Sequence, residues 1–258
     1  MQLTSTKNPV LQAIRRAASA GRPTEDDLIV AEGPHLLEEA LRGEWQVQQV
    51  FATERARARF SELLLRVEVE IVEVSERAFA STAPTETTQE ILALLRPRTW
   101  CWKELLAPGA LVVALDGVQD PGNAGTIVRS AEAFGATGLV FLQGCVRVAN
   151  GKLLRAAAGS LFRVPFVEAI AVNEFVRQAR RDDLLLYALV KDASSTLHDA
   201  DLQSRCALAV GSEGSGISRE LLMAAQPVSI PTAKVESLNA AVAGSIALFE
   251  AYRRRNAR

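Results

Sequence analysis

The chain has 258 residues, with 29 basic against 30 acidic side chains, which is enough for one large or two modest domains. Its composition is 48% hydrophobic and 23% charged, so a sizeable core can be buried and wholesale disorder is excluded. Three widely spaced cysteines and two histidines argue against a zinc site or a disulfide framework, and we expect no bound metal. No apolar run is long enough to span a bilayer and the N-terminus lacks a signal-peptide pattern, so we expect a soluble cytoplasmic protein with no membrane partner.

The cations are unevenly distributed along the chain. Of the 29, 24 are arginine, the side chain that grips phosphate in two places. Residues 1–24 and residues 133–167 each contain several cations and no acid. Such stretches indicate either solvated faces or a nucleic-acid surface, and both interpretations stay open at this point.

The first hundred residues alternate between helical and strand patterns. The spacing of apolar residues predicts helices at 8–19, 35–41 and 55–65, and strands at 28–31, 47–51, 67–74 and 91–95. Residues 97–108 combine two prolines, two tryptophans and two cations, and they continue neither period. We therefore predict a small α/β domain over residues 1–96 and a linker over residues 97–108.

The rest of the chain, residues 109–258, is more regular and is predicted to be a second domain. Continuous apolar strands are expected at 110–115, 139–142, 184–190, 207–210 and 228–230. Helices are expected at 124–134, 173–181, 219–225 and 238–255, the last with Ser237 as its N-cap. Apolar strands separated by helices predict a parallel sheet covered on both faces.

Three loops of this second domain follow the ends of apolar strands, where open α/β sheets place their ligands. They occupy residues 115–129, 210–218 and 230–239. The glycine spacings exclude the dinucleotide-binding and P-loop fingerprints, and the nucleophile elbow of α/β-hydrolases is absent as well.

Taken in order, the three loops resemble the three motifs of the SpoU/TrmH branch of the SPOUT RNA methyltransferases. The motifs are Asn-x-Gly-x-x-x-Arg at 123–129, Gly-Ser-Glu-Gly-x-Gly at 211–216, and Ile-Pro at 230–231 followed by Glu-Ser-Leu-Asn at 236–239. Residues 5–9 and 31–37 resemble the small RNA-binding α/β domain that often precedes this catalytic domain. The resemblance implies a parallel-sheet SPOUT methyltransferase domain over 109–258 whose C-terminal chain forms a trefoil knot, a rare arrangement among folds.

The resemblance also implies a cofactor, S-adenosyl-L-methionine, held bent in a pocket made largely of backbone. The cofactor contacts carried over by motif position are Gly211, Ile230 and Leu238, with Leu189 added at the end of its strand. The implied substrate is the ribose 2′-hydroxyl of a nucleotide in RNA, with rRNA favoured over tRNA.

The residues that the resemblance assigns to catalysis are Arg129, Asn123, Glu213, Ser237 and Asn239. A guanidinium has a pKa above about 12 and is a poor general base at neutral pH. We therefore expect Arg129 to hold the RNA phosphate and stabilise the forming alkoxide. Glu213 is expected between the cofactor loop and the substrate, while the other three orient the ribose and the loops.

The resemblance further favours a homodimer in which Arg129 of one subunit serves the cofactor of the other. Two alternatives remain. One is a non-catalytic RNA-binding or ribosome-assembly protein that retains the fold, which the intact motif residues disfavour. The other is a SPOUT enzyme that methylates a base nitrogen, which the third motif disfavours.

Overall fold

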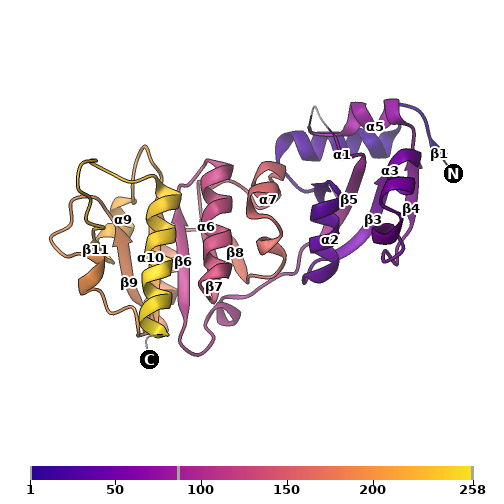
Figure 1. The fold of residues 1–258 in the computed structure, drawn as a ribbon. Coiled ribbons are helices and arrows are strands. Elements are labelled where there is room, and N and C mark those ends of the chain that lie inside the picture. The colour runs from indigo at the N-terminus through magenta and orange to yellow at the C-terminus, as the bar shows by residue number, and fades with distance from the viewer. Residues whose placement is uncertain (1, 86–87, 257–258) are drawn as a thin grey trace. The chain divides into compact units, whose positions relative to one another are not determined.

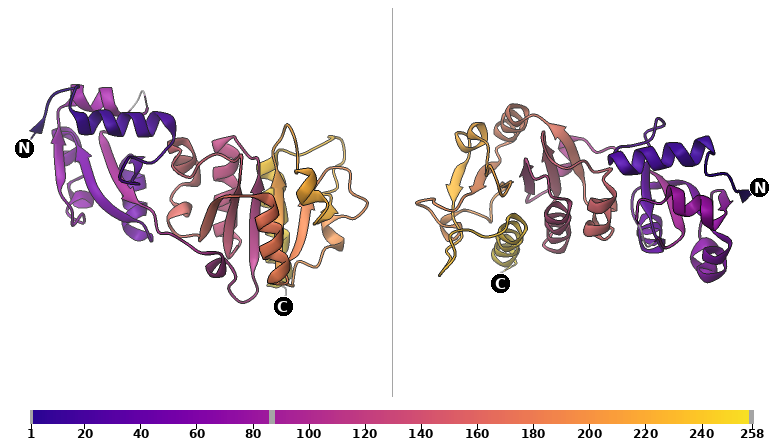
Figure 2. Two further views of the ribbon diagram at one scale, coloured as in Figure 1. Left: turned by 180° about the vertical axis from the view of Figure 1, so that it is seen from behind. Right: turned by 90° about the horizontal axis from the view of Figure 1, so that it is seen from above.

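The computed structural model describes residues 2–85 and 88–256, and the chain folds into two compact units (Figures 1 and 2). Residues 1, 86–87 and 257–258, which fall within the predicted domains, lie outside the described residues. Unit 1 comprises Met1–Arg98 and Arg147–Arg163, and unit 2 comprises Thr99–Val146 and Val164–Arg258. Residues 147–163 thus interrupt the sequence of unit 2 and belong to unit 1.

In the described part of the chain, unit 1 has a mixed five-stranded sheet. Its order is β1 (Gln2–Leu3), β4 (Ile71–Val74), β3 (Gln46–Ala52), β5 (Ile91–Arg96) and β2 (Ile29–Glu32). Strands β1, β4 and β3 are parallel, whereas β5 runs antiparallel to both β3 and β2. The helices are α1 (Pro9–Ala20), α2 (Pro34–Arg42), α3 (Glu54–Arg59), α4 (Ser61–Leu64) and α5 (Glu76–Thr82). The apolar face of α1 packs with Phe51, Phe79 and Leu92 to form the core of the unit.

The local structure of unit 1 differs from the sequence prediction at several points. The predicted helix at 55–65 is divided into α3 and α4, because Phe60 has φ −114° and ψ 31°. The predicted strand at 67–74 is limited to the four residues of β4. Strand β1 and helix α5 were not predicted; α5 follows Ser75, whose hydroxyl accepts a hydrogen bond from the Ala78 N–H.

The segment 147–163 of unit 1 lies within the predicted second domain, 109–258, and no helix or strand was assigned to it from the sequence. It forms α7 (Gly151–Ala157) and the 3₁₀ helix η2 (Ser160–Phe162). The ring of Phe162 packs edge-on against Trp45 at 4.8 Å between centroids, and Arg163 forms an ion pair of 2.5 Å with Glu39. Gly159 has φ +88°, and a Cβ there would lie 2.5–2.6 Å from side-chain atoms of Glu39. The segment is therefore fitted closely against the N-terminal part of the unit.

Unit 2 contains, within residues 99–256, a sheet of six parallel strands. Its order is β11 (Gln226–Val228), β9 (Leu185–Leu189), β10 (Cys206–Gly211), β6 (Leu111–Asp116), β7 (Gly138–Leu142) and β8 (Phe166–Ile170). Helices α6 (Pro121–Ala133) and α10 (Ala240–Arg255) pack together on one face, and α8 (Val172–Arg181) and α9 (Arg219–Leu222) on the other (Figures 1 and 2). Unit 2 also contains two short 3₁₀ helices, η1 (Trp102–Leu105), whose Leu105 is buried in the core, and η3 (Leu197–Asp199). The predicted parallel sheet with two covered faces is confirmed.

The start of α10 corrects one detail of the sequence analysis. The helix begins at Ala240 rather than Leu238, and its N-cap is Asn239 rather than Ser237. The Asn239 side-chain oxygen accepts hydrogen bonds from the N–H groups of Ala241 (2.9 Å) and Val242 (3.2 Å). An asparagine in this place satisfies N–H groups that have no partner within the helix. Among the described residues, no helix has the length and apolar character required to cross a membrane.

Candidate functional site

The carboxyl ends of β9, β10 and β11 lie at one edge of the unit 2 sheet, because the strands are parallel. The loops that follow them enclose a pocket of about 640 Å³. Its apolar wall includes Leu189, Ile230 and Leu238, and Gly211 lines it at the end of β10. All four residues predicted to contact the cofactor therefore lie around one cavity, as the order of the strands requires.

Gly211 lets the loop after β10 fold back onto the end of its own strand. A Cβ at this position would lie 2.3 Å from the carbonyl carbon of Gly216 and 2.5 Å from the nitrogen of Ile217. The folded-back loop is closed by a hydrogen bond of 2.9 Å from the Gly216 N–H to the Ser212 carbonyl. No side chain fits between these two backbone segments unless one of them moves.

Asp116 fixes the far end of the same loop. It is the last residue of β6 and is buried, and its carboxylate accepts a hydrogen bond of 2.7 Å from the Ser218 N–H. This residue was not among those predicted for the site. The signal that could have identified it is an acid that directly follows a continuous apolar strand.

One residue from each of the three motifs joins a hydrogen-bonded cluster at the pocket. Asn123 Nδ2 donates to Glu213 Oε1 at 3.0 Å, and Asn239 Nδ2 donates to Asn123 Oδ1 at 3.0 Å. Asn239 Nδ2 also donates to the same oxygen of Glu213. Within the described residues Glu213 Oε2 accepts no hydrogen bond, and the side chain is exposed. The cluster thus holds a carboxylate in one orientation with one oxygen free.

The two asparagines are positioned by the N-terminal ends of α6 and α10. Asn123 lies in the first turn of α6, where its N–H donates to the side chain of the N-cap residue Asp120 at 2.7 Å. Asn239 is the N-cap of α10. Since α6 and α10 pack side by side, their N-terminal ends bring both amides to the loop that carries Glu213.

The remaining predicted residues, Ser237 and Arg129, lie in different surroundings. Ser237 lines the pocket and is exposed, in the segment that leads to α10. Arg129 is exposed on α6 and does not line the pocket. In the described part of the chain Arg129 forms no ion pair or hydrogen bond. The structure therefore brings four of the five predicted catalytic residues to one place and leaves the fifth on the helix surface.

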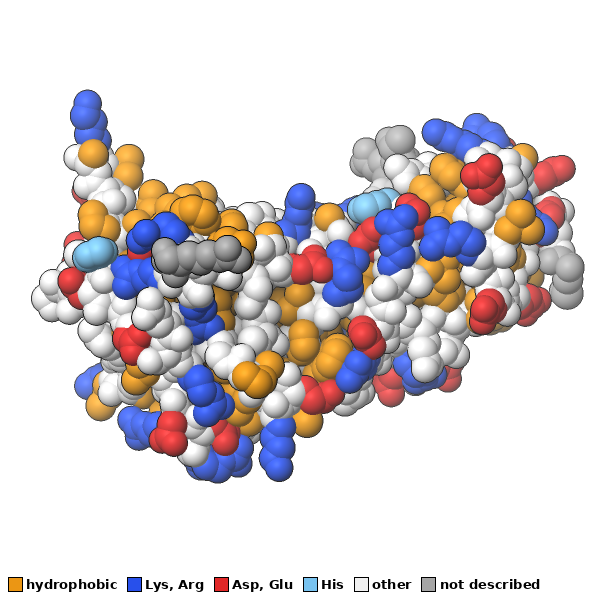
Figure 3. Space-filling view, turned by 60° about the horizontal axis from the view of Figure 1, so that its bottom comes forward, with side chains coloured by type: hydrophobic (Ala, Val, Ile, Leu, Met, Phe, Trp, Pro, Cys, Tyr) orange, Lys and Arg blue, Asp and Glu red, His pale blue; other side chains and the backbone are white. Residues whose placement is uncertain are grey.

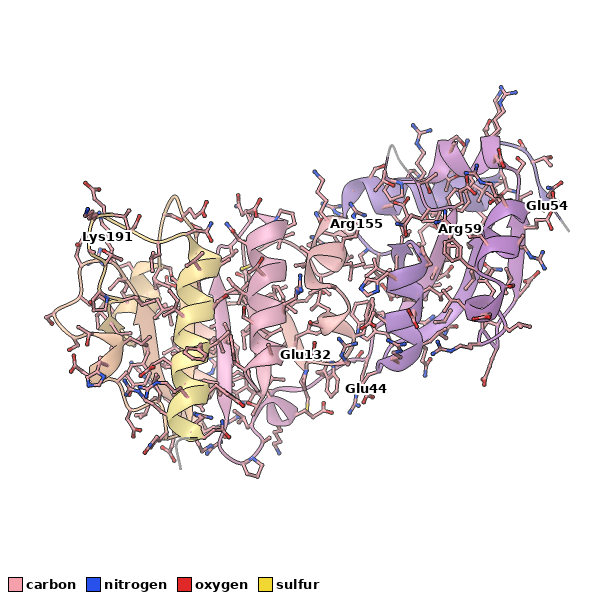
Figure 4. The ribbon with its side chains drawn as sticks, in the orientation of Figure 1. Glu44, Glu54, Arg59, Glu132, Arg155 and Lys191 are labelled. Atoms are coloured by element: carbon pink, nitrogen blue, oxygen red, sulfur yellow. The ribbon has the colours of Figure 1, made fainter. Side chains whose placement is uncertain are left out.

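Two charged residues at the pocket were not identified from the sequence. Glu236 lines it, as does Lys191, which follows β9 and is labelled in Figure 4. Lys191 forms a 3.7 Å ion pair with Asp192. Among the described residues no group of three or more histidine, cysteine or acidic side chains could hold a metal ion.

Comparison with known proteins connects this geometry with a family. The SpoU rRNA Methylase family matches residues 110–249, and the MRM3-like substrate binding domain matches residues 8–93. The 23S rRNA (guanosine(2553)-2′-O)-methyltransferase RlmP of Bacillus subtilis is 30% identical over 250 residues, which cover 96% of this chain and 98% of the relative.

Solved structures agree with these matches over nearly the whole chain. The SpoU methyltransferase AviRb of Streptomyces viridochromogenes, in complex with AdoMet, is 25% identical with a TM-score of 0.86, covering 97% of this chain and 99% of that one. The AdoMet-bound rRNA methyltransferase of Sinorhizobium meliloti is 28% identical with a TM-score of 0.85, covering 100% and 99%.

The fold, the pocket and these likenesses define an S-adenosylmethionine-dependent RNA 2′-O-methyltransferase. The chain belongs to the SpoU rRNA Methylase family and carries an N-terminal MRM3-like substrate binding domain. The predicted family, activity and cofactor are confirmed. The roles of the individual site residues stay predictions.

Proposed function

We propose that this enzyme methylates the ribose 2′-hydroxyl of a guanosine in large-subunit rRNA, in the cytoplasm. The observation that carries the proposal is the cluster of Asn123, Glu213 and Asn239 beside the pocket of unit 2. The choice of guanosine rests on the name of the Bacillus subtilis relative, which acts on a guanosine of 23S rRNA.

The pocket fits the cofactor in size and chemistry. Its volume of about 640 Å³ falls within the range usual for small-molecule sites. Leu189, Ile230 and Leu238 offer an apolar wall for an adenine ring, and the carboxylates of Glu213 and Glu236 lie at a pocket that must accept a positive sulfonium. When bound, S-adenosylmethionine supplies a methyl group activated for transfer. These side chains bind and orient it.

The hydrogen-bonded cluster orients the Glu213 carboxylate for a contact with the ribose. Two amide groups, from Asn123 and Asn239, hold one carboxylate oxygen, so that the other can accept a hydrogen bond from the 2′-hydroxyl. Ser237, which lines the same pocket, provides a second polar contact for the ribose or the cofactor. The same bonds tie the start of α10 to the loop after β10, the two segments that the predicted trefoil knot would bring together.

The position of Arg129 supports a homodimer. This motif residue lies exposed on α6, outside the pocket of its own chain. On the neighbouring α10, four large apolar side chains are exposed. They are three or four residues apart and therefore share one face of the helix: Val242 (46%), Ile246 (38%), Phe249 (49%) and Tyr252 (44%). Hydrophobic side chains gather on the surface of unit 2 beside the end of α10 (Figure 3). A second copy that covers this row would bring Arg129 to its partner's pocket.

In that position Arg129 would stabilise negative charge rather than remove a proton. Its guanidinium would hold the phosphate beside the target nucleotide and stabilise the alkoxide as the 2′-hydroxyl loses its proton. We expect Arg129→Ala to lower the single-turnover rate by roughly 100-fold to 1000-fold while the Kd for S-adenosylmethionine is unchanged. Arg129→Lys should also be slow, because an ammonium cannot make the paired contact.

Two experiments test the proposal. Deproteinised rRNA from cells that lack the gene should accept a labelled methyl group from the purified enzyme, and 2′-O-methyl mapping should locate it on a guanosine of the large subunit. A methyl group on tRNA alone, or on a base, would contradict the proposal. For the dimer, mixing Arg129→Ala with Gly211→Val subunits should restore activity, since one site of the mixed dimer receives both intact residues. If the mixture stays inactive, the site is complete within one subunit.

A further inference from the structure

Residues 1–24 and the central part of the second acid-free basic segment, residues 147–163, both belong to unit 1. Helix α1 ends at Gly21, which has φ +58°, and a Cβ on Gly21 would lie 3.2 Å from Nδ2 of Asn150. Asn150 is the N-cap of α7. The end of α1 lies beside α7 in all three ribbon views (Figures 1 and 2). Segments separated by more than a hundred residues therefore form one surface.

Four cations belong to this surface or flank it. Arg22 follows the end of α1, Lys152 and Arg155 lie on α7, and Arg147 precedes the cap. All four are exposed, and in the described part of the chain none forms an ion pair or a hydrogen bond through its side chain. The Arg155 guanidinium turns back along α7, 3.5 Å from the Cβ position of Gly151 (Figure 4).

Several other arginines of unit 1 are paired with acids. The ion pairs are Arg42 with Glu38 and Glu39, Arg55 with Glu90, Arg57 with Glu73, Arg66 with Glu38, and Arg98 with Glu44. With the Arg163–Glu39 pair, these ion pairs neutralise six arginines of the unit. The four cations at the α1–α7 junction form no such pair within the described residues, so their positive charge is available to a partner.

We propose that Arg22, Arg147, Lys152 and Arg155 form one binding surface for the RNA phosphate backbone. The inference rests on the proposed rRNA substrate and deepens it. The matched substrate-binding domain ends at residue 93, so this surface adds residues 147–155, from the sequence of the methyltransferase part, to substrate recognition. Arginine and lysine contacts to phosphate supply affinity and register but read no bases. The surface therefore positions the RNA, and the choice of nucleotide is made elsewhere.

The test is the salt dependence of RNA binding by the full-length protein. The variant is R22Q/K152Q/R155Q, and its matched control is K103Q/R180Q/R219Q, which removes three exposed cations from unit 2. The probe is a fluorescein-labelled single-stranded RNA of mixed sequence, titrated from about 50 to about 200 mM salt. Each lost phosphate contact lowers the slope of log Kobs against log salt by about 0.7, so the variant should lose about 2 and the control nothing.

Further variants and measurements distinguish a failure of the proposed surface from a failure of the proposed function. The charge-retaining variant R22K/K152R/R155K should keep the wild-type slope, and all variants should bind S-adenosylmethionine normally, which shows that they are folded. A slope equal to wild type in R22Q/K152Q/R155Q, or an equal loss in the control, overturns the proposed surface. Failure of the wild-type enzyme to methylate rRNA would instead refute the proposed function, and the measured slopes would still decide whether this surface binds RNA.

Discussion

Replacing Gly211 by alanine tests whether the cofactor pocket depends on the close approach of two backbone segments. The added Cβ would lie 2.3–2.5 Å from backbone atoms of Gly216 and Ile217, so one segment must move by about 1 Å to reach ordinary contact. The loop resists this movement, because its ends are held by the Gly216-to-Ser212 hydrogen bond and by Asp116. Overpacking of this kind costs about 1–3 kcal/mol, which corresponds to a Kd for S-adenosylmethionine weaker by about 5-fold to 150-fold.

Gly214→Ala is a matched control for this experiment. Gly214 belongs to the same loop and lines the same pocket, but a Cβ there meets no atom within 4 Å. Isothermal titration calorimetry should show weak binding for Gly211→Ala and near-normal binding for Gly214→Ala, with thermal unfolding to verify that both are folded. Normal affinity in Gly211→Ala would refute the reasoning, as would an equal loss in Gly214→Ala, which would mean that any added methyl group disturbs the loop.

Three further predictions concern other parts of unit 2. Asn239→Asp should keep the cap of α10 but lose methyl transfer, because a carboxylate cannot donate hydrogen bonds to Asn123 and Glu213. Asn239→Ala should lose methyl transfer and also destabilise the protein by about 1 kcal/mol, because the cap is removed. Equal stability of the two variants in urea unfolding would contradict this. Burial raises the pKa of the Cys145 thiol to about 11, so N-ethylmaleimide at neutral pH should modify the exposed Cys101 first, as mass spectrometry of digests can verify. A hydrogen bond from Arg253 lowers the pKa of Glu250 to about 2, so its stabilising contribution is present at neutral pH and is lost as the pH falls towards 2. The Tm difference between wild type and Glu250→Gln should therefore shrink between about pH 5 and about pH 2, and a constant difference would exclude this linkage.

The cofactor pocket could be predicted from the sequence, because its position follows from the order of the strands. Gly211, Ile230 and Leu189 each lie at or just beyond the end of an apolar strand, and parallel strands bring such ends to one edge. The hydrogen bonds among the motif residues could not be predicted from the sequence, because they depend on how α6 and α10 pack. Ser237 and Asn239 are equally good caps by residue type. The structure uses Asn239, whose amide also reaches Glu213.

The elements that sequence patterns missed are those whose stability comes from distant partners. Helix α7 has only seven residues, which is too short for a helical period to be recognised in the sequence. Its order depends on contacts such as those of Phe162 with Trp45 and of Arg163 with Glu39, about 120 residues apart in the chain. A local pattern carries no signal of such a contact. The break at Phe60 was not predicted either, because its neighbours on both sides favour a helix.

The interruption of unit 2 by residues 147–163 determines the order in which the protein can fold during synthesis. Residues 1–98 leave the ribosome first, but the contacts of Trp45 with Phe162 and of Glu39 with Arg163 cannot form until residues 162 and 163 have been made. By then β6 and β7 have been made, while the other strands of their sheet are still to come. The two units therefore complete their cores in an interleaved order rather than one after the other, and the chain passes between them after residues 98, 146 and 163.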